Sequence, residues 1–351
     1  MKQGFVIFLV FYSALLFGQA PSAESKALEL NYETSRLQSN VVLDQKKYWK
    51  QVAESQANNE QAWLNYFEAA RVSFVSSNSR VYSSSEKKEL ETIAAQVAAS
   101  LPQSYCHYYI QYMLIEKHDD SWPYLLKATE IRSSPDLLDD LVCYYSILKN
   151  SSGLSQAISQ LHSSGQINSE LLEYNQNVLN SIEQYGVLIT YGFADTYPIL
   201  LLQEIYGFRK DVQIICLDWI KSNKYKVELQ NRYGLSLDGL KSESEALKGC
   251  LKIESYPYVG LTLPPSLIKP YLDDLYCTGL ALKYSSEPVS NINNIAFNWS
   301  LFKKKHIRAS EDINVNYLVP LSLLIDYYQK RNEPIPADIQ ESHNYLNNRF
   351  K

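Results

Sequence analysis

The strongest constraint on the fold is the pattern of residues 187–217, where two short apolar runs flank a segment of helical length. Residues 187–191 are rich in β-branched side chains, and residues 212–217 repeat that composition. Such short runs indicate buried strands, whereas residues 197–206, closed by Gly207, indicate a helix. A strand, a helix and a second strand within about 30 residues form a βαβ unit with two parallel strands. The sequence therefore predicts a small α/β unit.

Residues 44–185 carry helical periodicity almost throughout. Trp63, Phe67 and Ala70 recur at the i, i+4 and i+7 positions of one helix face, and short Ser, Asn or Gly turns separate successive helices. Helix pairs follow one another at spacings of roughly 32–44 residues, which resembles the repeat of about 34 residues in tetratricopeptide-type α-solenoids. A plain helical bundle is the alternative.

The N-terminus has the pattern of a secretory signal peptide. Lys2 precedes an apolar run at residues 5–17, and small residues follow at 18–20. The run is shorter than the ~20 apolar residues that span a bilayer, and an uncleaved anchor is the alternative. We expect an exported bacterial protein, most simply periplasmic, that meets the membrane only through this peptide before cleavage.

These patterns predict a mainly α fold with a small α/β unit. The tail is expected to form two helices, at 317–330 and 337–349. The predicted segments are a signal peptide at 1–18, a leader at 19–43, a helical-repeat, α-solenoid-like domain at 44–184, and a small α/β domain with C-terminal helices at 185–351.

Composition excludes several classes of function. The formal net charge is −5, whereas a nucleic-acid binder normally carries a basic patch. No two of the 12 glycines are closer than five residues, so neither G-x-G-x-x-G nor G-x-S-x-G occurs. None of the five histidines forms H-E-x-x-H. We therefore predict no catalytic set, no cofactor and no metal.

The cysteines are odd in number and widely spaced. No C-x-x-C occurs, which removes zinc-ribbon and thioredoxin interpretations. Buried free thiols are the expected state, and one disulfide is the alternative in an oxidising compartment. The five are Cys106, Cys143, Cys216, Cys250 and Cys277.

Four short motifs in residues 185–331 carry a resemblance to a known family. They are Ile-Thr-Tyr-Gly-Phe-Ala-Asp-Thr-Tyr-Pro at 189–198, Leu-Gln-Glu-Ile at 202–205, Gly-Phe-Arg at 207–209 and Asp-Val at 211–212. This stretch resembles the soluble C-terminal region of a bacterial protein O-mannosyltransferase-like, or glycosyltransferase-like, membrane-protein family. The resemblance implies a link to glycans. Phe193 and Ala194 stand where that family has acidic and amide residues, so a paired-carboxylate cation site is not expected.

The loop after the first strand is the candidate ligand loop, because parallel α/β sheets bind ligands at the carboxyl ends of their strands. Asp195 or Thr196 is alternatively a helix N-cap. A local ion network of Glu204, Arg209 and Asp211 is the alternative to ligand contact for those three. The candidate ligand residues are Asp195, Thr196, Tyr197, Glu204, Arg209 and Asp211.

Aromatic residues on the N-terminal helices are candidates for contact with a protein partner in the cell envelope, since Tyr and Trp provide rigid contact area. Core packing is the alternative for them. The candidates are Trp63, Tyr66, Tyr108, Tyr109 and Tyr112. The sequence thus favours an exported, non-catalytic interaction or scaffold protein. The alternative is a glycan-binding accessory domain or an enzyme of cell-surface protein glycosylation, which a polar pocket beside Asp195 would favour.

Overall fold

The computed structural model describes residues 39–75, 82–115, 118–235, 242–309 and 312–350. Contacts divide this part of the chain into two compact units, which we call the N-terminal unit (described from residue 39 to 137) and the C-terminal unit (138 to 350). The described chain is mainly helical with a small mixed sheet. The predicted signal peptide and most of the predicted leader lie outside the described residues.

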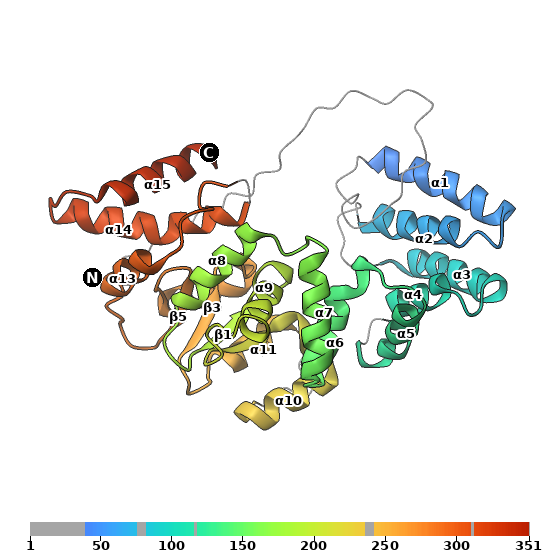
Figure 1. The fold of residues 1–351 in the computed structure, drawn as a ribbon, viewed down its shortest axis with the longest axis horizontal. Helices are drawn as coiled ribbons and strands as arrows, with labels where there is room; N and C mark the ends of the chain where they lie inside the picture. Colours follow the sequence, from blue (N-terminus) through green and yellow to red (C-terminus); the bar gives the residue numbers. More distant parts are fainter. Residues whose placement is uncertain (1–38, 76–81, 116–117, 236–241, 310–311, 351) are drawn as a thin grey trace. The chain divides into compact units, whose positions relative to one another are not determined.

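The N-terminal unit consists of helices (Figure 1). Trp63, Phe67 and Ala70 are buried, as their spacing predicts. Ser83 begins a helix with a capping box to Glu86. Neighbouring helices pack in the pairs α1 with α2 and α4 with α5. The helices are α1 (Ser39–Ser55), α2 (Glu60–Val75), α3 (Ser84–Ser100), α4 (Tyr105–Leu114) and α5 (His118–Ile131).

The first helix corrects one predicted boundary. Residues 39–43 were assigned to the leader, but α1 begins at Ser39, and Val42 is fully buried. The apolar pair at 41–42 therefore continues the helix face that packs against α2. A regular tetratricopeptide-like repeat stays a prediction for this unit.

The C-terminal unit is built on a five-stranded sheet of order β2-β1-β3-β5-β4. β1 pairs in parallel with β2 and with β3, whereas β5 is antiparallel to β3 and to β4. The parallel β1–α9–β2 unit confirms the predicted βαβ motif. The strands are β1 (Val187–Thr190), β2 (Gln213–Cys216), β3 (Pro257–Gly260), β4 (Leu275–Cys277) and β5 (Ala281–Tyr284).

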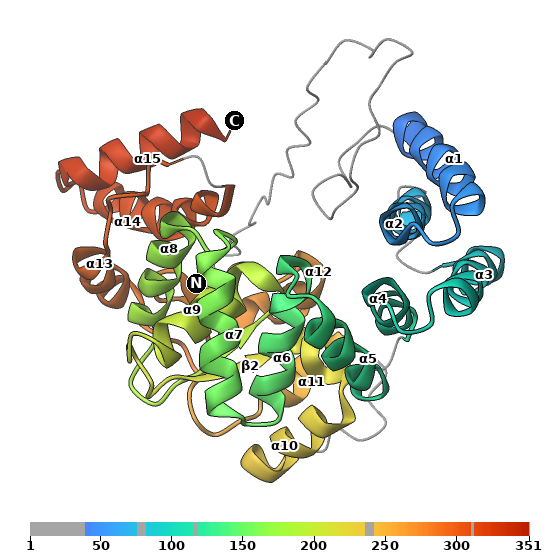
Figure 2. The same ribbon diagram turned by 45° about the vertical axis from the view of Figure 1, so that its right-hand side comes forward.

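Helices cover the sheet. β2 lies on one side of β1 and β3 lies on the other. The β1-to-β2 and β2-to-β3 connections therefore run in opposite directions along the sheet. Because such crossovers are right-handed, they place their helices on opposite faces of the sheet. α9 packs against α6, α7 and α8, and Figure 2 shows α7 beside α6 and α9. The C-terminal unit also contains the short helix α12 (Pro265–Ile268) and the 3₁₀ helices η3 (Leu217–Lys221), η4 (Lys269–Asp274) and η5 (Asp312–Tyr317). The others are α6 (Leu138–Ile147), α7 (Ser151–Ser163), α8 (Ser169–Asn180), α9 (Phe193–Glu204), α10 (Asn223–Tyr233), α11 (Glu243–Cys250), α13 (Ile292–Leu301), α14 (Leu318–Lys330) and α15 (Ala337–Arg349).

The boundary between the two compact units lies between residues 137 and 138, whereas the sequence pattern predicts a domain boundary at 184–185. Helices α6, α7 and α8 look like a continuation of the N-terminal helices in sequence, but all three pack against α9 of the C-terminal unit. A helical period identifies the buried face of a helix but not the partner against which that face packs.

Other predicted features can be compared directly. The two C-terminal helices are confirmed, and Figure 1 shows α14 between α15 and α13, a helix that the sequence pattern did not reveal. All five cysteines are buried and free. Burial raises the pKa of the Cys216, Cys250 and Cys277 thiols to about 12, so they are poor nucleophiles. None of the helices in the described ranges is long and apolar enough to cross a bilayer.

Candidate functional site

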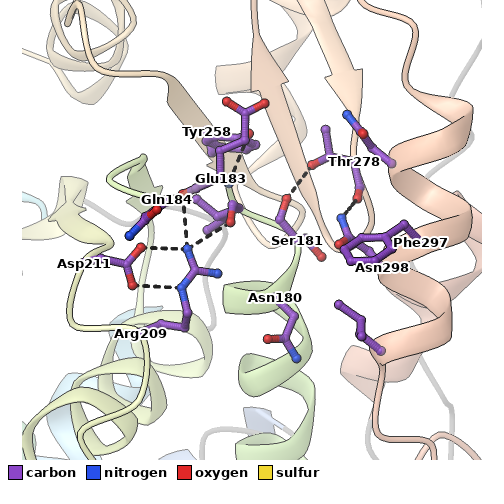
Figure 3. A pocket seen from close by; sticks show the side chains of 13 residues that line it. Asn180, Ser181, Glu183, Gln184, Arg209, Asp211, Tyr258, Thr278, Phe297 and Asn298 are labelled. Atoms are coloured by element: carbon purple, nitrogen blue, oxygen red, sulfur yellow. Dashed lines mark hydrogen bonds and ion pairs between the residues drawn. The ribbon is translucent and has the colours of Figure 1, made fainter.

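A pocket of about 550 Å³ lies at the amino-terminal edge of the parallel strands (Figure 3). Its walls come from residues 180–184 at the end of α8, the turn at 209–211 before β2 and residues 294–301 of α13, together with Tyr258 of β3 and Thr278 after β4. The first two segments directly precede β1 and β2, which defines the edge on which the pocket lies. We call this cavity the amino-edge pocket.

Arg209 organises one wall of the amino-edge pocket. Its Nε and Nη2 donate to the two carboxylate oxygens of Asp211, each at 2.9 Å. Nη1 donates to the carbonyl of Leu179 at 2.6 Å, and Nη2 also donates to the carbonyls of Ile182 and Glu183 at 3.0 and 3.2 Å (Figure 3). Carbonyls at a helix C-terminus lack intrahelical partners. Arg209 therefore caps α8 with donors that are then occupied within the protein.

The charges around the amino-edge pocket balance one another. Hydrogen bonds from Arg209 lower the pKa of Asp211, which also accepts the backbone N–H of Tyr185 at 3.2 Å. Glu183 forms an ion pair with Lys283 at 2.7 Å. Each carboxylate of the lining thus has a cationic partner, and the pocket has no excess positive charge to offer a ligand.

Three amide side chains line the same cavity. Asn180 is half-buried, and Gln184 and Asn294 are exposed. Within the part of the chain that the structure describes, none of the three amides is hydrogen-bonded to another protein group. In Figure 3 the Asn180 amide lies between Arg209 and Asn298. An amide offers two donors and an acceptor, so these groups can bind a neutral polar ligand.

The α13 side of the amino-edge pocket combines a fixed polar floor with an apolar rim. Asn298 donates to the carbonyl of Thr278 at 2.5 Å, and the Thr278 hydroxyl donates to the carbonyl of Ser181 at 2.9 Å. On the rim, Phe297 is 63% exposed and Leu301 is 49% exposed. Packing of the protein core does not account for an exposed aromatic ring beside amides that have no hydrogen-bond partner in the protein.

The predicted ligand loop lies at the opposite, carboxyl edge of the sheet, away from the amino-edge pocket. Gly192, at φ +84°, is the N-cap of α9, so the prediction that Asp195 or Thr196 caps this helix is wrong. The buried carboxylate of Asp195 accepts the backbone N–H of Tyr191 at 3.0 and 3.2 Å and the hydroxyl of Thr262. Asp195 therefore joins the loop after β1 to the segment after β3.

The other residues of this loop are also occupied by the protein. The Thr196 hydroxyl donates to Thr190 Oγ1 at 2.9 Å, and its Oγ1 is 3.4 Å from Cys216 Sγ. Tyr197 is buried and stacks on Phe193. The loop is filled, and neither of the two pockets described here includes any of these residues.

Burial changes the ionisation of the carboxylates at the carboxyl edge. It raises the pKa of Asp195 from 3.8 to about 7, because hydrogen bonds from Thr262 and Tyr191 only partly offset the loss of water. Burial also raises the pKa of Asp218, whose Oδ2 would lie 3.8 Å from a Cβ added at Gly192. Among the described residues, no cluster of three His, Cys, Asp or Glu could hold a metal ion.

Glu204 does not pair with Arg209 or Asp211. The predicted ion network of three residues is therefore wrong for Glu204. The pair of Arg209 and Asp211 forms. Glu204 lines a separate cavity of about 320 Å³ beside the edge strand β2. Glu204 and Arg209 are five residues apart, but α9 ends at Glu204, and Gly207 at φ +65° redirects the chain between them.

Four of the five aromatic candidates of the N-terminal unit are core residues. Trp63, Tyr66, Tyr109 and Tyr112 are buried, and only Tyr108 is half-buried. The hydroxyl of Tyr109 donates to Glu68 at 2.7 Å, which satisfies it inside the unit. The alternative that the sequence analysis left open, core packing, accounts for these four.

The sequence analysis missed the amides and the ring of the amino-edge pocket. Asn180 looks like an ordinary residue at the end of an amphipathic helix, and no residue at 292–301 was a candidate for ligand binding. An apolar residue at 297 flanked by amides at 293, 294 and 298 was the available signal. It becomes informative only when α13 is known to pack on α8.

Comparison with known protein families gives a match for part of the C-terminal unit. A family model described as TMEM260-associated domain 2 matches residues 171–237, which include Asn180, Arg209 and Asp211. The match is loosely consistent with the resemblance of residues 185–331 to a protein O-mannosyltransferase-like family. No curated protein and no solved structure matches the chain.

Proposed function

We propose that this protein binds an uncharged carbohydrate in the amino-edge pocket and takes part in protein glycosylation as a binding component. The observation that supports this most is the set of unpartnered amides, Asn180, Gln184 and Asn294, beside the exposed ring of Phe297. Sugars present hydroxyl groups that pair with amides, and apolar faces that pack on aromatic rings. A pocket of about 550 Å³ has the size of a small-molecule site.

The electrostatics of the pocket support a neutral ligand over an anionic one. Phosphate and carboxylate ligands are recognised by free Arg or Lys groups or by helix N-termini. Arg209 is already committed to Asp211 and to the carbonyls of α8. The end of α8 that faces the pocket is its C-terminus, where the helix dipole is negative. A nucleotide sugar or a sialylated glycan therefore fits the site less well than a neutral sugar.

The family match supplies the biological context of this proposal. Residues 171–237 carry both the match to the TMEM260-associated domain and most of the motifs that resemble O-mannosyltransferase-like proteins. In this chain the loop at 193–195 has lost the paired acidic residues of that resemblance, and Asp195 is enclosed. Both features favour a role in binding. We also propose that the protein acts after export, as its N-terminal pattern predicts.

The proposal is tested with a glycan array that holds neutral, sialylated and phosphorylated saccharides, followed by calorimetry on the best binder. Asn180→Ala and Asn294→Ala should each weaken binding about tenfold, the loss expected for a hydrogen bond of about 1.4 kcal/mol. Asn293→Ala is the matched control, because this exposed neighbour lies outside the pocket lining. Absence of saccharide binding, or binding that Asn180→Ala leaves unchanged, would contradict the proposal.

Binding of a protein partner through helical repeats is the function that the sequence first favoured. It stays a prediction, since no contact described here tests it. Its candidate residues Trp63, Tyr66, Tyr109 and Tyr112 are used in packing, so a partner would have to contact other side chains. We therefore place it behind carbohydrate binding.

A further inference from the structure

Two exposed tyrosines stand next to the amino-edge pocket in a costly backbone conformation. Tyr185 is 66% exposed with φ +61°, and Tyr256 is 53% exposed with φ +25°. Residues other than glycine rarely adopt positive φ, because the Cβ then crowds the backbone. Strain of this kind is often found at ligand-binding positions.

The two tyrosines are neighbours at one edge of the sheet. Each lies just before a parallel strand, Tyr185 before β1 and Tyr256 before β3. The pairing of Val187 with Pro257 sets these two strands side by side, and the N–H of Val187 donates to the carbonyl of Tyr256 at 3.1 Å.

Both residues are linked to the pocket lining, Tyr185 directly and Tyr256 through Lys283. The N–H of Tyr185 donates to Asp211, which lines the pocket. The ring of Tyr256 lies 4.8 Å from the ammonium of Lys283, and Lys283 in turn pairs with Glu183 of the lining. Both tyrosines are therefore adjacent to residues that line the amino-edge pocket.

Folding does not explain why these positions carry tyrosine. Glycine would adopt the same backbone without strain, and an exposed ring contributes little burial. In the described structure Tyr256 makes one ring contact, to Lys283, and Tyr185 makes none.

We propose that Tyr185 and Tyr256 form a second subsite, which stacks on the next sugar of a chain whose first unit occupies the amino-edge pocket. This inference rests on the proposed carbohydrate binding and narrows the ligand to an oligosaccharide of two or more units. Tyrosine rings offer flat, rigid contact area with few rotatable bonds, which suits an extended, neutral sugar chain.

The test compares saccharides of different length on Tyr185→Gly and Tyr256→Gly variants of the full chain. Calorimetry with mannose, mannobiose and mannotriose, and with glucose, cellobiose and cellotriose, measures each affinity. Each variant should lose about fivefold or more in affinity for the di- and trisaccharide, the loss that truncating a contacting aromatic ring ordinarily brings. Affinity for the monosaccharide should stay unchanged, and thermal stability should not fall, because glycine relieves the positive φ.

Controls separate this subsite from the pocket itself. Asn332→Gly removes another exposed side chain at positive φ, in the turn between α14 and α15, and should alter no affinity. Tyr185→Asn and Tyr256→Asn repeat the loss of the ring with a residue that tolerates this conformation. If both tyrosine variants bind the oligosaccharides as the parent does while Asn180→Ala does not, the subsite is refuted and the pocket stands. If the parent binds none of the six saccharides, the proposed function falls, and the subsite with it.

Discussion

Arg209 and Asp211 form a two-point ion pair, with both nitrogen–oxygen distances at 2.9 Å, in the turn that leads into β2. The same guanidinium caps the end of α8. One side chain therefore ties the helix before β1 to the turn before β2, and it shapes the wall of the amino-edge pocket. A local tripeptide pattern, Arg-x-Asp, becomes a long-range connection once the chain has folded.

Replacing Arg209 should destabilise the C-terminal unit. We expect Arg209→Ala to lower the free energy of unfolding by about 2 kcal/mol or more, because several charge-assisted hydrogen bonds are lost and the α8 carbonyls lose a donor. Arg209→Lys should restore only part of this, since an ammonium cannot reproduce the planar fork. Urea denaturation measures both. Glu341→Ala, which breaks the exposed pair with Arg308, is the control and should change the value by less than about 0.5 kcal/mol.

Asp195 should make stability depend on pH. Its pKa is about 7 in the folded protein and near 3.8 when exposed. The folded state therefore favours the protonated form, and this contribution is complete below pH ~4 and is lost as the pH rises to ~7. As the pH rises over that interval, the free energy of unfolding of Asp195→Asn should increase relative to that of the parent by up to about 4 kcal/mol, at about 1.4 kcal/mol per pKa unit.

Denaturation of the parent and Asp195→Asn at pH 4, 5, 6 and 7 measures this difference. Groups that titrate equally in both proteins cancel. A difference that stays constant with pH would show that Asp195 is ionised throughout. Asparagine keeps an oxygen for the Tyr191 N–H and an amide for Thr262, so the variant should fold.

Gly153 should not tolerate alanine, although it lies inside helix α7. A Cβ at this position would lie 2.4 Å from the ring of Tyr145, so the ring would have to move. Helix propensity alone would favour alanine by about 1 kcal/mol. Overpacking costs about 1–3 kcal/mol. This cost should outweigh the gain in helix propensity and make Gly153→Ala destabilising. Thermal unfolding checks the sign, and Ser152→Ala at the exposed neighbouring position should be neutral or mildly stabilising.

Tyr109 should act as a core residue. Tyr109→Phe removes the hydroxyl that donates to Glu68, and we expect a loss of about 1–2 kcal/mol in the stability of the N-terminal unit. Tyr108→Phe is the matched control, since its half-buried ring has no described hydroxyl partner, and its effect should be below about 0.5 kcal/mol. Equal effects of the two substitutions in denaturant titrations would count against the assignment of Tyr109 to the core.

Local features of the fold were predictable because their causes are local. Ser83, Ser104 and Asn168 cap helices, and such caps are local because each needs only a side-chain oxygen within three residues of a free N–H. The βαβ unit was predictable because two short apolar runs, separated by a segment of helical length between two glycines, are compatible with few other arrangements of secondary structure. The prediction failed at Asp195, where the same cap signal was present but Gly192 begins the helix and the carboxylate is buried.

The sequence by itself determined that residues 44–185 are mainly helical, that residues 187–217 form a βαβ unit, and that no common phosphate-binding or nucleophile motif is present. Only the tertiary structure decided the domain to which α6–α8 belong and the place of the candidate site. Residues 180, 209 and 294 come from three distant segments and meet only because α8, the turn before β2 and α13 pack together. Whether a polar side chain is free for a ligand depends on the groups that already bind it. Those groups are set by packing over long sequence distances, which a local pattern does not encode.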